Sequence, residues 1–188
     1  MQEIQWAHQK DPNATHQKLL YHVANLGRGK ILEFGAGYYS TPILYKIAQD
    51  KRGRCMSFES NTNFVGKFFD DNNMHFTIMD VTWSTFFDSP LCQELVKLHW
   101  DLVFVDSSPW EARLTTIEHF KNCCDYLILH DCDYFLTTGV IKDWSEHFKY
   151  YQIYVPPKPW PYQTGPPTLL ASNTIPEVKL KIDGMVTI

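Results

Sequence analysis

The stretch KILEFGAGYYST, residues 30–41, begins with an apolar run and contains two glycines, Gly35 and Gly37. Glu33 precedes the first glycine by two positions, and Ser40 follows the second by three. An apolar strand that ends in such glycines and leads into a helix is typical of turns that cradle a nucleotide-containing ligand. The stretch therefore predicts a nucleotide-type site at the end of an early strand.

The rest of the chain alternates between strand-like and helix-like segments. We expect Thr15 to cap a helix over residues 16–26, where apolar residues recur at helical spacing. Strands that alternate with helices predict a parallel sheet covered on both faces. The expected fold is one α/β domain over residues 1–188, with a doubly wound, mainly parallel seven-stranded sheet and an antiparallel last strand. Strands are expected over 30–35, 54–60, 74–80, 100–106, 125–133, 150–155 and 167–172, helices over 40–50, 62–71, 91–99, 110–120 and 140–148, and a hairpin over 178–188.

Two segments lie outside this alternation. Residues 1–14 are interpreted as an N-terminal extension or lid, and residues 156–167 as a stiff proline-rich loop. A loop of this length is longer than a compact fold needs. Its role is either a plain connection or a lid that carries Trp160 and Tyr162, and the sequence leaves both open.

Composition and charge narrow the class of protein. The 188 residues are 44% hydrophobic and 15% aromatic, as in an ordinary folded domain. A net charge of −4 without a Lys/Arg run argues against a nucleic-acid partner. The N-terminus has no signal-peptide core, and no segment approaches the ~18 apolar residues of a membrane helix. Five cysteines without C-x-x-C spacing indicate reduced thiols. We expect a cytoplasmic protein with a small-molecule partner and no membrane partner; the oligomeric state stays open.

Acidic residues lie at the ends of five of the expected strands. Carboxyl ends of parallel strands meet at one edge of the sheet, so these side chains are expected to face one crevice. Glu33 would repel a pyrophosphate but suits a cationic amine, and S-adenosylmethionine has an amine and no phosphate. Glu59 can accept both hydroxyls of a ribose, and Asp80 can accept from an adenine amino group. The acids concerned are Glu33, Glu59, Asp80, Asp106, Asp131 and Asp133.

These residues resemble the class I, Rossmann-like S-adenosylmethionine-dependent methyltransferases. LEFGAGYYST is similar to their first motif, SFES to the acid after the second strand, IMDV to the adenine-site acid, and DLVFVD to the fourth motif. Two tyrosines after the second glycine, in place of another glycine, depart from the first motif. The resemblance implies cofactor binding by Glu33, Gly35, Gly37, Ser40, Thr41, Glu59 and Asp80.

A narrower resemblance is to cation-dependent O-methyltransferases of the catechol and caffeoyl-coenzyme A type. These have an Asp after the fourth strand and an Asp-Asn pair after the fifth; Asp106 and Asp131 match, and Cys132 stands at the Asn position with Asp133 as a substitute. LILHDCDYF also resembles the HDVDR segment of plant glucuronoxylan O-methyltransferases. The resemblance implies O-methylation of a small hydroxylated or sugar-like acceptor, with Mg²⁺, Ca²⁺ or Mn²⁺ at Asp106, Asp131 and Asp133. The implied catalytic residues are Asp106, Asp131 and His130, which is the nearest candidate base.

Two other classes of function stay open. Asp131-Cys132-Asp133 is an Asp-x-Asp pattern, which metal-dependent glycosyltransferases use to hold a sugar nucleotide, although this interpretation leaves Glu33 and Gly35 unexplained. The third class is a non-catalytic nucleotide-binding module of the same fold. Methyltransferases that act on nitrogen often carry paired prolines at the fourth strand, and residues 106–110 lack them. This argues against a nucleic-acid base or an amide as the methyl acceptor.

Overall fold

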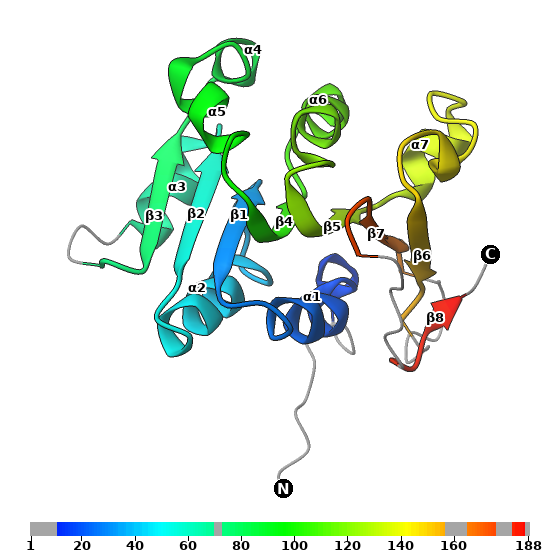
Figure 1. Ribbon diagram of the computed structural model, residues 1–188, viewed down its shortest axis with the longest axis horizontal. Helices are drawn as coiled ribbons and strands as arrows, with labels where there is room; N and C mark the ends of the chain where they lie inside the picture. The colour runs from blue at the N-terminus through cyan, green and yellow to red at the C-terminus, as the bar shows by residue number, and fades with distance from the viewer. Residues whose placement is uncertain (1–10, 70–72, 157–164, 176–181, 187–188) are drawn as a thin grey trace, which may run out of the picture.

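The computed structural model describes residues 11–69, 73–156, 165–175 and 182–186. Its centre is one sheet with the strand order β3-β2-β1-β4-β5-β7-β6-β8 (Figure 1). The order reverses between β1 and β4, so the carboxyl ends of these two strands border the switch point at which α/β sheets bind ligands. The strands are β1 (Lys30–Phe34), β2 (Arg54–Glu59), β3 (Phe76–Asp80), β4 (Trp100–Val105), β5 (Cys124–His130), β6 (Tyr150–Tyr154), β7 (Thr168–Ser172) and β8 (Met185–Val186).

The sheet is parallel from β3 to β5 and becomes antiparallel at β7. Strand β7 runs against both β5 and β6, which confirms the reversed strand expected over 167–172. The described sheet has eight strands rather than seven, because Met185 and Val186 pair with Tyr154 and Ile153 at the β6 edge. Of the hairpin expected over 178–188, residues 182–186 are described and supply this eighth strand.

Helices cover both faces of the sheet, as the doubly wound expectation requires. One face packs against α1 (Gln17–Ala24), α2 (Thr41–Asp50) and α3 (Thr62–Phe68). The other packs against α4 (Trp83–Phe86), α5 (Pro90–Leu95), α6 (Trp110–Phe120) and α7 (Asp133–Thr137). Figure 1 shows α1 and α2 on one side of the strands and α4 to α6 on the opposite side. Strand residues alternate between the two cores, since successive side chains point to opposite faces.

Several local expectations change in the structure. Thr15 does not cap α1: His16 occupies the N-cap position, while the Thr15 hydroxyl contacts the end of β5. The helix expected over 140–148 is a short 3-10 turn, η3 (Trp144–Glu146). A second 3-10 turn, η2 (Pro12–Ala14), precedes α1. Trp160 and Tyr162 of the proline-rich loop, and residues 1–10 of the N-terminal extension, lie outside the described residues.

Two general expectations can be compared with the structure. All five cysteines are free thiols, as their spacing predicts. Within the described part of the chain, no helix is long and apolar enough to cross a membrane.

Candidate functional site

The glycine turn after β1 is held against the end of β4 by close backbone packing. Gly35 has a φ of +97°, which favours glycine. A Cβ atom at this position would lie 2.4 Å from the backbone carbonyl of Asp106. The two strand ends are also joined by hydrogen bonds, because the Asp106 amide donates to the Phe34 carbonyl over 2.7 Å. Gly35 therefore lets the turn lie directly on the first residue after β4.

Gly37 has a different environment. A Cβ atom there would meet only the Ser40 hydroxyl, at 3.5 Å, so this position tolerates a side chain sterically. Its amide donates to the Thr41 hydroxyl over 2.9 Å. That hydroxyl in turn donates to the Glu33 carboxylate, with oxygen–oxygen distances of 3.1 and 3.0 Å. The turn is thus fixed by the first residue of α2 and, through it, by β1.

Glu33 lies beneath the turn and is fully buried. Its carboxylate accepts hydrogen bonds from the hydroxyls of Thr41 and Ser57. Burial raises the pKa of this carboxyl group from its usual 4.5 to about 7, although the hydroxyls of Ser40, Ser57 and Thr41 act in the opposite direction. The position supports the turn rather than presenting a carboxylate to solvent.

Glu59 ends β2 and binds three backbone amides. One carboxylate oxygen accepts from the Ala36 amide at 2.9 Å, and the other accepts from the Ser60 and Asn61 amides, each at 2.7 Å. Asp80, its neighbour in the register of β2 and β3, is exposed. The two acids therefore lie side by side at the carboxyl edge, as the sequence predicts.

A cavity of about 350 Å³ lies between the glycine turn and the N-terminal segment that precedes α1. Its size is at the lower end of the range for small-ligand sites, ~300–1,000 Å³. The segment is attached to the turn by the Tyr39 hydroxyl, which donates to the Asp11 carboxylate. The residues that line the cavity are Asp11, Asn13, His16, Ala36, Gly37, Tyr38, Tyr39, Ser40, Phe64 and Asp106.

Asp106, on the cavity wall, belongs to a buried network centred on Arg113 of α6. The guanidinium donates to Asp106 over 2.8 Å and to Asp131 over 3.2 Å. It also donates to the backbone carbonyls of Ser107 and His130, both at 2.7 Å, and lies over the Trp110 ring. Burial acts to raise the pKa of Asp106, but His130 and Arg113 outweigh it, and the pKa is lowered. Asp106 is therefore an ionised, well-held carboxylate.

Solved structures show which fold this is. No family model matches the sequence, and no curated protein matches it. Human methyltransferase-like protein 13, solved with S-adenosylhomocysteine, superposes with a TM-score of 0.55 at 15% identity, over 88% of this chain and 85% of that one. A Staphylococcus aureus protein provisionally assigned as a caffeoyl-CoA O-methyltransferase gives 0.55 at 12% identity, over 82% and 81%. A spermidine synthase, solved with the transition-state analogue AdoDATO, gives 0.57 at 14% identity, over 86% and 60%.

The chain has the class I, Rossmann-like methyltransferase fold. At these identities the likeness lies in the fold, and the spermidine synthase shows that the fold by itself does not decide the reaction. The reaction of this chain therefore depends on the residues at the carboxyl edge of its sheet.

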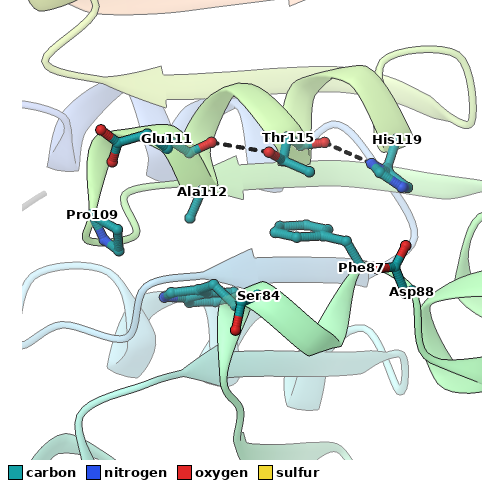
Figure 2. A pocket seen from close by; sticks show the side chains of 9 residues that line it. Ser84, Phe87, Asp88, Pro109, Glu111, Ala112, Thr115 and His119 are labelled. Carbon is teal, nitrogen blue, oxygen red and sulfur yellow. Dashed lines mark hydrogen bonds between the residues drawn. The ribbon is translucent and has the colours of Figure 1, made fainter.

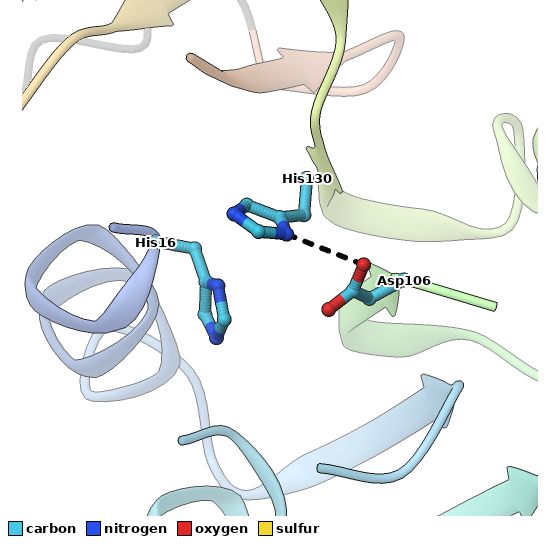
Figure 3. A group of neighbouring side chains, drawn as sticks. All are labelled: His16, Asp106 and His130. Carbon is cyan, nitrogen blue, oxygen red and sulfur yellow. Dashed lines mark hydrogen bonds and ion pairs between the residues drawn. The ribbon is translucent and has the colours of Figure 1, made fainter. Parts of the chain in front are cut away.

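Only two of the three carboxylates predicted as metal ligands share a partner among the described residues. Arg113 contacts both Asp106 and Asp131, while Asp133 is exposed on the first turn of α7. Within the described residues, the group of His, Cys, Asp or Glu ligand atoms that does converge consists of His16, Asp106 and His130 (Figure 3). This group shares Asp106 with the predicted ligand set, but it contains two histidines in place of Asp131 and Asp133.

Two residues of this site were not indicated by the sequence. His16 is buried at the start of α1, and Arg113 is buried on α6, although arginine is usually exposed and histidine is intermediate in burial. Burial lowers the pKa of His16 to about 3, and nearby His130 adds to this effect, so His16 is a neutral imidazole. A polar residue that interrupts the buried side of a helix is a weak sequence signal for such a role.

A second cavity, of about 390 Å³, lies between α4 and α6 (Figure 2). Trp83 and Phe87 of the α4 segment face Ala112, Thr115 and His119 of α6 across it. None of the residues predicted from the sequence as site residues lines this cavity.

Proposed function

We propose that this chain is an S-adenosylmethionine-dependent methyltransferase that methylates an oxygen atom of a small hydroxylated or sugar-like acceptor. The observation that carries the proposal is the cavity at the β1–β4 switch point, with the glycine turn as one wall and Asp106 as the other. This is the place where an α/β sheet of this topology binds its ligand. The similarity in fold to a protein solved with S-adenosylhomocysteine supports the choice of cofactor.

The turn supports the cofactor contacts that the sequence predicts. Gly37 and Ser40 line the cavity and would contact the amino-acid end of the cofactor. The amides bound to Glu59 leave lone pairs of its carboxylate for a ribose hydroxyl, and Asp80 is free at the edge for the adenine amino group. Gly35 shapes the turn, while Glu33 and Thr41 contribute through the hydrogen bonds that fix it.

We propose that the acceptor and the methyl group meet at Asp106, which lines the cavity. Transfer from a sulfonium is an in-line displacement, which needs an aligned acceptor oxygen and a group that receives its proton. Asp106 is ionised and reaches the cavity; Arg113 and His130 contact it, and Arg113 also binds Asp131. The preference for oxygen rests on the resemblance of residues 127–135 to O-methyltransferases and on the missing paired prolines. The proposal does not depend on a metal ion at Asp106, Asp131 and Asp133.

Calorimetric titration with S-adenosylhomocysteine tests the cofactor site. Gly37→Ala adds a methyl group at the cavity wall where the backbone can accept it, so we expect at least tenfold weaker binding with an unchanged melting temperature. Gly66→Ala is the matched control, because its added Cβ on α3 has no neighbour within 4 Å. Equal affinity of the two variants, or no binding by the wild-type protein, would contradict the proposed site.

Turnover separates the methyltransferase from its alternatives. S-adenosylmethionine is incubated with a panel of hydroxylated acceptors, and methylated products are detected by mass spectrometry. Thermal stabilisation by UDP-sugars instead of S-adenosylhomocysteine would favour the glycosyltransferase. Tight cofactor binding without any product across the panel would favour the non-catalytic module.

A further inference from the structure

We propose that His16, Asp106 and His130 form a binding site for one divalent transition-metal ion of the Zn²⁺ or Mn²⁺ class. The three side chains come from the start of α1 and from the ends of β4 and β5, and Figure 3 shows them pointing toward one another. Their potential ligand atoms all lie within 4.8 Å of each other. Bonds of ~2.0–2.2 Å place two ligands of one ion at most ~4.4 Å apart, so a closing movement of a few tenths of an ångström is sufficient.

His16 provides the first argument. Its side chain is 2% exposed, yet neither ring nitrogen has a hydrogen-bond partner of regular geometry in the described part of the chain. The Tyr39 backbone lies near the ring, but no hydrogen bond of regular geometry joins them. A buried polar group without a partner is costly, and a neutral imidazole is the form that binds metal ions. A metal ion would bind one of the two ring nitrogens of His16.

His130 provides the second argument, through the directions of its two ring nitrogens. The Thr15 hydroxyl donates to the Pro166 carbonyl at 3.1 Å, and its oxygen lies 2.9 Å from Nε2 of His130. Nδ1 of the same ring faces Asp106 at 3.2 Å and Asp131 at 3.4 Å. One ring nitrogen is therefore held by Thr15, while the other is directed at the carboxylates, where one metal ion would serve both His130 and His16.

The surroundings of the three ligands fit a metal site. A hydrogen bond from the second ring nitrogen commonly orients a histidine that binds a metal ion, and the contact from His130 to Thr15 has this form. Arg113 occupies one oxygen of Asp106 and leaves the other for the ion, while Asp131 balances the charge of Arg113. Two imidazoles and one carboxylate suit Zn²⁺, Mn²⁺ or Fe²⁺ better than Mg²⁺ or Ca²⁺.

His16 and Asp106 also line the cavity, so the ion would have open positions on the cavity side. There it would bind an acceptor hydroxyl and lower its pKa. This last step rests on the proposed methyltransferase function; the metal site itself does not.

The experiment measures metal binding by the whole protein without cofactor. The protein is stripped with a chelator, dialysed, and titrated with Zn²⁺ and Mn²⁺, and X-ray absorption is recorded on the Zn²⁺ form. We expect one ion per chain with two imidazole ligands. Affinity should fall at least 100-fold in His16→Ala and about 10–100-fold in Thr15→Val, while Thr15→Ser retains it. His99→Ala, which removes an exposed histidine that pairs with Asp125, should bind like the wild type.

The proposal is overturned if the wild-type protein binds no ion stoichiometrically, or if the absorption spectrum shows no imidazole ligands. It is also overturned if folded His16→Ala binds with wild-type affinity. The absorption spectrum is recorded on the wild-type protein, so it still tests the proposal if His16→Ala fails to fold. Binding of S-adenosylhomocysteine to the metal-free protein is measured separately, and its failure would count against the methyltransferase proposal alone.

Discussion

The buried carboxyl group of Glu33 makes the stability of this fold depend on pH in a predictable direction. Burial raises its pKa from 4.5 to about 7 in the folded protein. Below pH 4.5 both the folded and the unfolded chain hold the proton, and the stability that this group contributes is fully present. As the pH rises toward 7, the unfolded chain releases the proton first, so the free energy of unfolding falls. Above pH 7 the loss is complete.

The size of this loss follows from the two pKa values. A difference between 4.5 and about 7 corresponds to about 3 kcal/mol, at ~1.4 kcal/mol for each unit. Glu33→Gln removes the titrating proton but keeps a side chain that can bind the hydroxyls of Thr41 and Ser57. We therefore expect the variant to gain about 3 kcal/mol relative to the wild type between pH 4.5 and pH 8.

Urea unfolding at half-unit steps of pH measures both proteins, and the difference between the two curves isolates Glu33 from other titrating groups. Parallel curves would refute the reasoning, because they would mean that Glu33 titrates alike in the folded and unfolded states. The same variant also tests the role of this residue in binding. If Glu33 only supports the turn, affinity for S-adenosylhomocysteine should change less than about threefold, whereas loss of a direct bond to the cofactor amine would cost ~1.5–3 kcal/mol.

Three further predictions concern the turn and the network beside it. Gly35→Ala should lower the free energy of unfolding by at least about 3 kcal/mol, since it combines a strained φ of +97° with a backbone clash; normal stability in urea would show that the turn can relax. Arg113→Ala should cost about 3–5 kcal/mol in urea unfolding, because two partly buried carboxylates lose their shared cation, and a loss below about 1 kcal/mol would contradict this. Glu59→Ala should weaken S-adenosylhomocysteine binding by ~1.5–3 kcal/mol in calorimetry and lower the melting temperature; unchanged affinity would remove the ribose assignment.

The strands and the glycine turn of this fold follow from local sequence patterns, and the structure has them almost as predicted. Apolar runs such as LVFV, residues 102–105, place apolar side chains on both faces of a strand, so both faces have to be covered by helices. These runs form the central strands of the sheet. The glycine turn is equally local, since Gly35 needs its conformation wherever the strand ends. Helix ends were less predictable: Thr15 has the chemistry of a cap, but a tertiary partner, His130, takes its hydroxyl.

The candidate site depends on contacts that no local pattern records. Arg113 is one of several polar residues on a helix, and it becomes a central cation only because α6 packs over the ends of β4 and β5. His16 reaches the same place because α1 packs against β4, where the His16 ring contacts Phe104, 88 positions later in the sequence. Without these two residues, the acids at the strand ends predict a metal site made of carboxylates alone.

The acids at the carboxyl edge have distinct environments, and these environments determine how negatively charged the cavity is. Glu33 is buried under the turn, Glu59 is bound to amides, and Asp106 and Asp131 share Arg113. Of the six acids, only Asp80 and Asp133 have carboxylates without a hydrogen bond or ion pair in the part of the chain that is described, and neither lines the cavity. The site is therefore far less negative than the count of acids indicates, because its charges are compensated in place. A cofactor whose amino-acid end carries one positive and one negative group suits such a wall better than a multiply charged cation would.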